Sequence, residues 1–446
     1  MGGTLTEKIK ITGGRPLKGE VYISGAKNAV LKLMAAALLA KGESKIHNVP
    51  ELTDVVIMLN VLEQLGAKTK YDRIEKSITI DATEITDVRA GYELVSRMRA
   101  SFIVLGALVG RCKEAVVALP GGCAIGERKV DFHIKGLEAL GTDVKIENGY
   151  VHAKVKNLTG NDIYLDIPSV GATENIMLAA VLAEGATRIQ NAAQEPEIVD
   201  LSNFLNAMGA DITGAGTSEI VINGVKQEDL KPIEYTTIPD RIEAGTYMAA
   251  FTATKGKGII RNIFPNHLTF YTSKLTKMGA DIKLIDPTSI EVSCKRRLDA
   301  VNIITQPYPG FPTDLQSLAM ALATVADGVS IITESLYENR FMQVGELRKM
   351  GADIHQERNH ALVKGVKRLA GANLRASDLR AGASLVIAAL MAEGESIIDN
   401  IYHIDRGYEL LEEKFRNIGA DIIRYKEDES DIITQNKGSL SESTKL

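Results

Sequence analysis

The chain has 446 residues, of which 45% are hydrophobic and 24% charged, and its formal net charge is −5. This length and apolar content can bury a large core, while the three cysteines are too few and too scattered for a disulfide framework or a CxxC metal site. The near balance of charge argues against nucleic-acid or anionic-membrane partners, and the longest apolar stretch is too short for a membrane span. We therefore expect a soluble, cytoplasmic protein.

The first part of the chain alternates short strands with apolar helices. The pattern predicts strands at residues 8–11 and 20–23, an apolar helix at 29–40, a strand at 44–48, a second helix at 55–65 and a closing strand at 78–80. The predicted unit is therefore strand, helix, strand, helix, strand, strand.

A short phrase shows that this unit is repeated six times. The phrase is a large apolar residue, glycine, a small residue and then a charged residue, with glycines at Gly66, Gly141, Gly209, Gly279, Gly351 and Gly419. Each copy follows an apolar helix ending in glycine by 23 to 25 residues, except the second copy, where the distance is 31. Such units bury their helices only against their siblings, and insertions between them map to loops on one face.

The inserted residues of the second copy coincide with the glycine-rich loop that contains Cys123. A cysteine is usually a small buried hydrophobe, which suits Cys112 and Cys294. Cys123 lies instead among glycines, and Arg128 and Lys129 just downstream would lower its thiol pKa. The loop lacks the Lys-Ser/Thr pair of a nucleotide triphosphate cradle. These features predict a reactive cysteine.

Two further segments divide the chain. Residues 226–239 are polar and contain two prolines, which indicates a connection between two lobes of three repeats each. Residues 426–446 are charged and serine-rich with little apolar content, so we expect a disordered C-terminal tail.

The N-terminal turn of each apolar helix carries polar residues that share one position in the repeat. They are Lys27 and Asn28, Arg97 and Arg99, Ser169 to Thr173, Asp240 and Arg241, Thr313 and Asp314, and Asp378 and Arg380. If the lobes face one another, six helix N-termini with unpaired backbone N–H groups converge there, which favours an anionic ligand. Lysine and arginine at these points suit phosphate and carboxylate groups.

Each residue also has a structural alternative. Thr313 and Gln316 have the spacing of a capping box, and a helix dipole alone favours an acid at Asp314. Asn28 could cap its helix, Arg380 could pair with Asp378, and single surface lysines and arginines are usually solvated. Recurrence at one repeat position favours the functional interpretation.

Ten short segments carry a family resemblance that extends from Ile9 to Tyr425. They are Gly25–Asn28, Met98–Ser101, Pro120–Arg128, Ser169–Thr173, Glu195–Asp200, Pro239–Glu243, Phe311–Asp314, Glu338–Phe341, Asp378–Ala381 and His403–Glu409. With these segments the chain resembles the UDP-N-acetylglucosamine 1-carboxyvinyltransferases, which are enolpyruvyl transferases.

The resemblance implies an α/β fold, the two-lobed inside-out α/β barrel of six βαβαββ repeats. One lobe would span residues 22–236, and the other residues 1–21 with 237–425. The implied reaction moves enolpyruvyl from phosphoenolpyruvate to the 3-hydroxyl of UDP-N-acetylglucosamine with release of phosphate, the first committed step of peptidoglycan synthesis. It would need no metal or organic cofactor and no obligate protein partner.

The resemblance also implies residue roles. Asp314 corresponds to the base that takes the hydroxyl proton, and Cys123 to the acid that also forms an adduct with phosphoenolpyruvate. Lys27, Arg128 and Arg406 correspond to ligands of the phosphate, and Arg340 and Arg380 to ligands of the carboxylate. The nucleotide-sugar contacts correspond to Asn28, Arg99, Arg128, Lys129, Val130, Asp131, Phe132, Ser169, Val170, Gly171 and Leu336.

Two rival functions remain. The sister enzymes that act on shikimate 3-phosphate share the repeats, but the Cys123 loop argues against that activity. A non-catalytic repeat protein that binds anions or RNA in its cleft would need a stronger basic and aromatic surface than this sequence offers.

Overall fold

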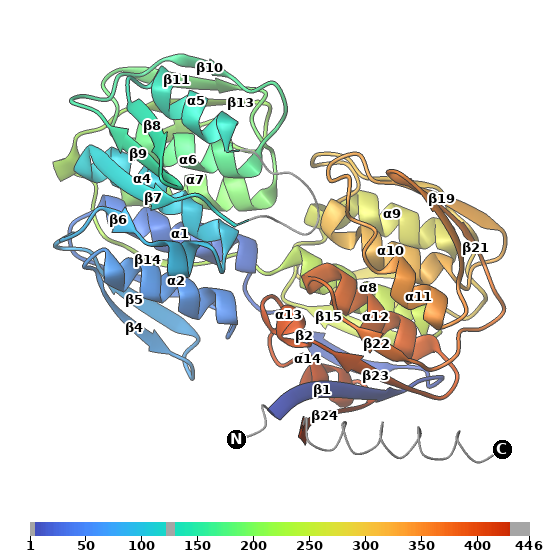
Figure 1. The fold of residues 1–446 in the computed structure, drawn as a ribbon. Helices are drawn as coiled ribbons and strands as arrows, with labels where there is room; N and C mark the ends of the chain where they lie inside the picture. The colour runs from blue at the N-terminus through green and yellow to red at the C-terminus, as the bar shows by residue number, and fades with distance from the viewer. Residues whose placement is uncertain (1–4, 122–129, 429–446) are drawn as a thin grey trace.

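The structure is a computed structural model that describes residues 5–121 and 130–428 (Figure 1). Of the predicted site residues, Cys123, Arg128 and Lys129 lie outside the described residues. Within the described part of the chain, none of the helices has the length and apolar character needed to cross a bilayer.

The described residues form six four-stranded sheets that share one strand order. In the fifth repeat, β18 (Ile303–Ile304) pairs in parallel with β19 (Val329–Thr333), because a helix connects them. β21 (His360–Lys364) then pairs antiparallel with both β19 and β20 (Asp353–Glu357). Every sheet repeats this pattern, which confirms the predicted βαβαββ unit.

The other sheets have the following members. In the first lobe they are β14 (Glu234–Thr236), β3 (Glu43–His47), β5 (Ser77–Asp81) and β4 (Lys68–Asp72); β6 (Arg89–Ala90), β7 (Glu114–Ala118), β9 (Tyr150–Lys154) and β8 (Asp143–Glu147); β10 (Asp162–Tyr164), β11 (Ala186–Gln190), β13 (Glu219–Asn223) and β12 (Asp211–Thr213). In the second lobe they are β2 (Lys18–Tyr22), β15 (Lys257–Arg261), β17 (Ser289–Ser293) and β16 (Asp281–Asp286); β22 (Asn373–Arg375), β23 (Glu395–Asp399), β1 (Leu5–Thr12) and β24 (Asp421–Asp428).

Helices connect these strands in each repeat. The helices of the first lobe are α1 (Lys27–Ala36), α2 (Thr53–Gln64), α3 (Tyr92–Val95), α4 (Val104–Cys112), α5 (Asp131–Ala139), α6 (Val170–Ala180) and α7 (Pro196–Met208). Those of the second lobe are α8 (Arg241–Ala253), α9 (Thr269–Met278), α10 (Gln316–Ala323), α11 (Val344–Lys349), α12 (Leu379–Met391), α13 (Tyr402–Asp405) and α14 (Leu411–Asn417). Short 3-10 helices are η1 (Ala37–Leu39), η2 (Arg99–Ile103), η3 (Gln227–Asp229), η4 (Pro265–Leu268) and η5 (Thr313–Leu315).

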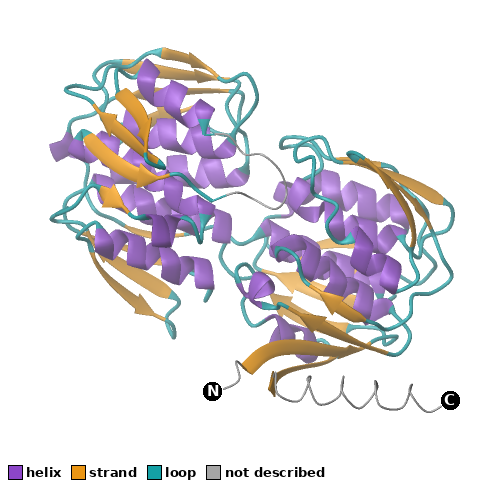
Figure 2. Cartoon of the chain, viewed as in Figure 1, coloured by secondary structure: helices purple, strands orange, loops and turns teal. Residues whose placement is uncertain are grey.

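Helices fill the inside of each lobe and the sheets lie outside them (Figure 2). The first helix of a repeat explains this arrangement, because apolar or small side chains predominate on all of its faces. In α12, every residue from Arg380 to Leu390 is buried. The buried apolar residues form two separate clusters, one per lobe. This is the two-lobed inside-out α/β barrel that was predicted.

The N-terminal strand completes the last repeat of the second lobe. β1 lies between β23 and β24 and pairs antiparallel with both. Its partner β24 continues to Asp428, opposite Leu5, and so enters the segment that was predicted to be a disordered tail from residue 426. Pairing with β1 satisfies the backbone of these polar residues, a contact that composition alone does not reveal.

The two lobes exchange their first strands. β2 precedes α1 of the first lobe but pairs with β15 of the second lobe, while β14 precedes α8 of the second lobe and pairs with β3 of the first. The predicted boundary at residue 22 therefore falls slightly early, since Ile23 still belongs to the core of the second lobe.

The two crossing segments pair with one another. Gly25 and Pro239 form an antiparallel bridge, the Ala26 N–H donates to the Ile238 carbonyl at 2.7 Å, and the Asp240 N–H donates to the Ser24 carbonyl at 2.8 Å. The segments at Ser24 and Asp240 lead into α1 and α8, so this pairing fixes the starts of two helices from opposite lobes.

Gly25 should be irreplaceable at this crossing. A Cβ there would lie 1.6 Å from the Asn48 carbonyl oxygen, and backbone atoms cannot move aside cheaply. We expect Gly25→Ala to lower the free energy of unfolding by about 3 kcal/mol or more, the upper range for overpacking. Gly345→Ala is the matched control, because nothing lies within 4 Å of a Cβ in that helical position. Equal urea midpoints for the two variants would contradict the packing argument.

Candidate active site

A buried carboxylate, Asp54, joins cations from the two lobes. Its Oδ2 lies 2.7 Å from Lys27 Nζ at the start of α1, and its Oδ1 lies 2.8 Å from Arg406 Nε at the end of α13. Asp54 is 1% exposed and Lys27 8% exposed, so both charges are held away from solvent. The structure thus brings together two of the three residues predicted to bind phosphate.

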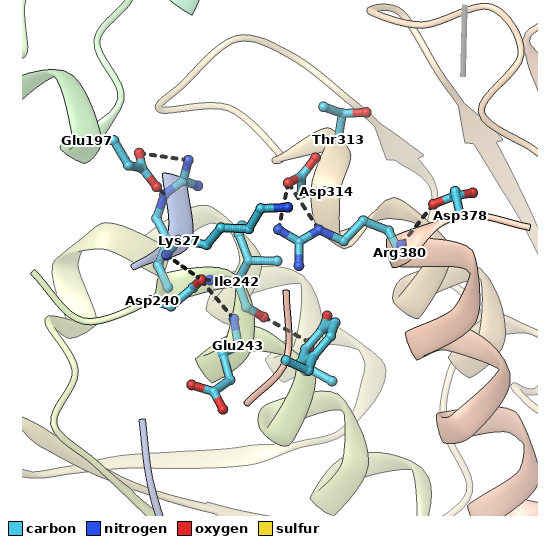
Figure 3. A network of polar contacts seen from close by, with 12 residues as sticks. Lys27, Glu197, Asp240, Ile242, Glu243, Thr313, Asp314, Asp378 and Arg380 are labelled. Atoms are coloured by element: carbon cyan, nitrogen blue, oxygen red, sulfur yellow. Dashed lines mark hydrogen bonds and ion pairs between the residues drawn. The ribbon is translucent and has the colours of Figure 1, made fainter. Parts of the chain in front are cut away.

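A second carboxylate, Asp314, is held by two arginines of the second lobe. Arg340 Nη2 donates to Asp314 Oδ1 at 2.6 Å, while Arg380 Nε and Nη2 donate to Oδ2 at 3.1 and 3.0 Å. Both arginines are buried and the Asp314 side chain is about a quarter exposed. Figure 3 shows Lys27 and Arg380 pointing to the same region as Asp314, with Asp240 nearby. The predicted base and the predicted carboxylate ligands therefore form one cluster.

Thr313 positions Arg340 rather than capping a helix. Its hydroxyl donates to Glu334 Oε2 at 2.8 Å and accepts from Arg340 Nη1 at 2.8 Å. Neither η5 nor α10 has a side-chain cap, so the capping box does not form. Glu334 is buried and also accepts from Thr305, which fixes its carboxylate. The capping-box alternative for Thr313 and Gln316 is therefore wrong, whereas Asp314 does lie in the first turn of η5, where the helix dipole also favours an acid.

The local ion pair suggested for Arg380 is also wrong. Asp378 caps α12 by accepting the backbone N–H groups of Arg380 and Ala381, at 2.8 and 3.1 Å. The guanidinium points instead to Asp314 and lies against Tyr408, 5.6 Å from the ring centroid. Its buried Nη1 has no hydrogen-bond partner among the described residues. An unpaired buried guanidinium N–H is costly unless a ligand accepts from it.

The residues predicted to contact the nucleotide sugar lie at helix starts in the first lobe. Ser169 caps α6 by accepting the Ala172 N–H, and Val170 and Gly171 form the first turn of that helix. Val130, Asp131 and Phe132 begin α5, with Asp131 exposed and Phe132 half-buried. Arg99 opens η2 and is half-buried.

His133 joins the α5 and α6 parts of this group. Its ring would lie 2.9 Å from a Cβ at Gly171, so the glycine permits the close approach. Asn175 Oδ1 accepts the Gly106 N–H, so its Nδ2 is the donor to His133 Nδ1 at 2.8 Å. Burial, with the charges of Arg99 and Lys32, lowers the pKa of His133 from 6.5 to about 3.

Asn28 and Leu336 occupy the remaining predicted positions. Asn28 lies half-buried in the first turn of α1, whose N-cap is Ala26 with no side-chain cap, so Asn28 does not cap the helix. Leu336 is 36% exposed and lines a cavity of about 480 Å³ between residues 334–339 and Gln356, Arg358 and Asn359. Arg340 follows directly on this lining.

Further charged residues join the lobes around the site. Arg241 at the start of α8 pairs with Glu197 of α7 through two hydrogen bonds of 3.0 and 3.2 Å. Glu409 of the second lobe accepts from Lys76 of the first lobe at 2.8 Å and from the Glu51 N–H at 2.9 Å. The lobe junction is therefore ionic as well as covalent.

Sequence reasoning missed Asp54, Glu197 and Glu334, although the repeat contains a signal for them. In four repeats an asparagine with φ between 55° and 58° follows the second strand, at Asn48, Asn191, Asn262 and Asn400. Asparagine tolerates this left-handed backbone. The other two repeats have Leu119, which opens the Cys123 segment, and Glu334 in its place. Departures from the repeat thus mark the site.

The position six residues after this point carries charge in four repeats. It holds Asp54 and Glu197 in the first lobe, and Arg340 and Arg406 in the second. Each of these four side chains takes part in one of the ion pairs described above. Asp54 and Arg406 therefore pair with one another across the lobe junction, whereas Arg340 pairs with Asp314 of its own lobe.

Proteins that resemble this chain in sequence are named as carboxyvinyltransferases. The family model for EPSP synthase (3-phosphoshikimate 1-carboxyvinyltransferase) matches residues 11–415. The UDP-N-acetylglucosamine 1-carboxyvinyltransferase 2 of Carboxydothermus hydrogenoformans is 52% identical over 419 residues, covering 94% of this chain and 99% of that protein. The UDP-N-acetylglucosamine 1-carboxyvinyltransferase of Gloeobacter violaceus is 51% identical over 417 residues, covering 94% and 90%. The chain belongs to the UDP-N-acetylglucosamine 1-carboxyvinyltransferase family.

Solved structures agree with this membership. The enolpyruvyl transferase NikO from Streptomyces tendae superposes with a TM-score of 0.85 at 26% identity, covering 95% of this chain and 100% of that one. An EPSP synthase from Acinetobacter baumannii has a TM-score of 0.73 at 19% identity with the same coverage, which shows a shared fold. The present chain is an enolpyruvyl transferase, as its sequence predicted.

The neutral state of His133 predicts acid sensitivity. The unfolded chain binds a proton near pH 6.5, whereas the folded ring does so only near pH 3, so the stabilisation is complete above pH 6.5 and is lost as pH falls. Between pH 7 and pH 5 this single residue should cost about 2 kcal/mol. We expect His133→Asn, which can still accept from Asn175, to lose less stability over that range. If the urea midpoints of the original protein and of His133→Asn fall equally between pH 7 and pH 5, His133 does not cause the acid sensitivity.

Proposed function

We propose that this enzyme transfers the enolpyruvyl group of phosphoenolpyruvate to the 3-hydroxyl of UDP-N-acetylglucosamine and releases phosphate, the first committed step of peptidoglycan synthesis. The observation that carries this proposal is the presence of two cation clusters, each with one member at a helix start. Lys27 and Arg406 form one cluster and Arg340 and Arg380 the other. Phosphoenolpyruvate carries two anionic groups, so each cluster can take one of them.

The division of the two groups between the clusters follows the family resemblance, and the chemistry of the cations is compatible with it. Arg340 and Arg380 present planar guanidinium forks, which match a carboxylate, and the unpaired Nη1 of Arg380 supplies a further donor. Lys27 and Arg406 come from opposite lobes and can surround a tetrahedral phosphate, with Arg128 as the third predicted ligand. Phosphate binding would then draw the lobes together.

Asp314 is the proposed general base. In the structure its carboxylate accepts hydrogen bonds from the guanidinium groups of Arg340 and Arg380. When the substrate carboxylate takes over those arginines, Asp314 becomes available to the sugar hydroxyl. The hydroxyl proton then passes to Asp314 while the oxygen bonds to C2 of phosphoenolpyruvate and C3 gains a proton. Loss of a C3 proton and cleavage of the C2–phosphate bond restore the double bond and release phosphate.

Cys123 is the proposed acid that protonates C3 and can form an adduct at C2. The remaining thiols are poor alternatives on chemical grounds. Burial raises the pKa of the Cys112 thiol, and Cys294 is 2% exposed with its Sγ against the carbonyl oxygens of Gly279 and Arg296. A buried or fully protonated thiol does not react readily.

The nucleotide sugar would lie along the first lobe, on Asn28, Arg99, residues 128–132, Ser169–Gly171 and Leu336 of the second lobe. Both substrates are small molecules, and the cytoplasm is the proposed location. The test is phosphate release from phosphoenolpyruvate with UDP-N-acetylglucosamine, with shikimate 3-phosphate and with no acceptor. Phosphate release that requires UDP-N-acetylglucosamine supports the proposal. Phosphate release that requires shikimate 3-phosphate instead would show that the chain has the activity of the sister enzymes.

Replacing Asp314 by Asn should lower turnover by about two orders of magnitude or more, the usual scale for a lost general base. The variant should still fold, because asparagine has the same shape and its Oδ1 can accept from one arginine, although loss of the counter-charge of two buried arginines should lower its urea midpoint. Asp378→Asn is the matched control, since asparagine also caps helices and the hydrogen bonds of Asp378 within the described residues go to the backbone of α12. Near-normal turnover of Asp314→Asn would reduce Asp314 to a partner of the two arginines.

Replacing Lys27 by Ala should raise KM for phosphoenolpyruvate about tenfold or more, the effect of losing one charge-assisted contact to a dianion. The affinity for UDP-N-acetylglucosamine should change little. Lys76→Ala, which removes a lysine of the lobe junction from Glu409, serves as the control. If calorimetric titration shows that both substrates weaken equally, Lys27 shapes the cleft and does not bind the phosphate specifically.

A further inference from the structure

Asp54 is a buried acid with no role in the chemistry proposed above. It lies in the first turn of α2, and its two oxygens contact Lys27 of its own lobe and Arg406 of the opposite lobe. Lys27 and Arg406, the two cations proposed to bind the substrate phosphate, are therefore already paired with the Asp54 carboxylate. The question is what this carboxylate does for them.

The repeat-equivalent acid Glu197 provides a comparison. Glu197 also pairs across the lobes, with Arg241, and both partners are largely buried. Among the contacts found in the described residues, Glu197 has no lysine beside it, whereas Asp54 has Lys27 at 2.7 Å. The two acids thus share the task of joining the lobes, and contact with a buried lysine distinguishes Asp54.

Lys27 needs a counter-ion because its surroundings oppose its charge. Burial lowers its pKa, the carboxylate of Asp54 opposes that effect, and the guanidinium groups of Arg406 and Arg380 add to the lowering. Asp240 accepts the backbone N–H of Lys27 at 3.3 Å. The charged and titratable groups that act on the neighbouring Arg380 are Asp314, Tyr408 and Asp240. Without the charge of Asp54, burial and two arginines would all favour the neutral amine.

Asp54 itself stays ionised. Burial alone would raise its pKa, but the charge of Lys27 and the hydrogen bond and charge of Arg406 outweigh burial, so the pKa lies below its ordinary value. Its position at the N-terminal turn of α2 adds a favourable helix dipole. The carboxylate is therefore a permanent negative charge beneath the two cations.

We propose that Asp54 is a positioning residue that keeps the Lys27 ammonium charged and holds Arg406 of the opposite lobe beside it until the substrate phosphate arrives. This inference rests on the proposed function, in which Lys27 and Arg406 bind that phosphate. Asp54 contacts the cations and not the reacting atoms, so it acts on phosphoenolpyruvate through them.

The test is the pH dependence of the association constant for phosphoenolpyruvate, measured by calorimetric titration in a Cys123→Ser background so that the proposed acid does not itself titrate. In Asp54→Asn the alkaline limb should move to lower pH by about one unit or more, because Lys27 loses its proton earlier. The Kd for UDP-N-acetylglucosamine should stay within about twofold of its original value. Asp54→Glu, which retains the charge, should leave the limb in place.

Two further variants separate this role from a structural one. Glu197→Gln removes the equivalent interlobe pair without touching Lys27, so its alkaline limb should not move. Arg406→Gln removes a repelling charge beside Lys27, so its limb should move to higher pH even though the affinity for phosphoenolpyruvate falls at every pH. This opposite shift remains measurable if Asp54→Asn does not fold.

The contradicting outcomes are distinct. An unmoved limb in Asp54→Asn, or an equal shift in Glu197→Gln, overturns the positioning role. If Lys27→Ala leaves phosphoenolpyruvate binding unchanged, the assignment of Lys27 within the proposed function fails instead. If Lys27→Ala binds phosphoenolpyruvate more weakly but Asp54→Asn keeps the original pH profile, the role of Asp54 is refuted and the proposed function is not.

Discussion

The fold depends on burying the first helix of each repeat on all sides. A helix with one apolar stripe needs one neighbour, but α12 and its equivalents are buried all round and need helices on one side and a sheet on the other. Three repeats together meet that need, which gives two lobes with helices inside and sheets outside (Figure 2). Most of the charged side chains of the site lie near helix ends or in the adjoining loops, and a charged side chain within a helix has a buried partner, as Lys32 of α1 has in Glu174 of α6.

The charged side chains of the site can be buried without a large loss of stability because almost every one has a partner of opposite charge. Asp54 is bound to Lys27 and Arg406, Asp314 to Arg340 and Arg380, and an isolated buried ion of either sign would be strongly destabilising. The same arrangement prepares the site for a ligand. A substrate with a phosphate and a carboxylate finds the cations already aligned, and it has to replace only contacts that the protein makes with itself.

The repeat supplies the scaffold, and departures from it supply the chemistry. Where four repeats place a left-handed asparagine, the fifth has Glu334, which holds Thr313 and through it Arg340. The second repeat has Leu119 at that point, followed by the segment with Cys123. The position six residues further on carries Asp54 and Glu197 in the first lobe and Arg340 and Arg406 in the second, and two of these side chains, Asp54 and Arg406, pair with one another across the junction.

The sequence determined the repeat, the order of strands and helices within it, and the family, because glycine spacing and helical periodicity are local properties. It also predicted Lys27, Asp314, Arg340, Arg380 and Arg406 as site candidates. Only the tertiary structure decided which of them meet. The resemblance had already placed residues 1–21 with the second lobe, but the pairing of β1 with β24, the pairing of β14 with β3 and the contact of Asp54 with Arg406 join segments far apart in the chain. Composition and spacing carry no record of such contacts, because they depend on how whole repeats pack and on which buried charge needs a partner.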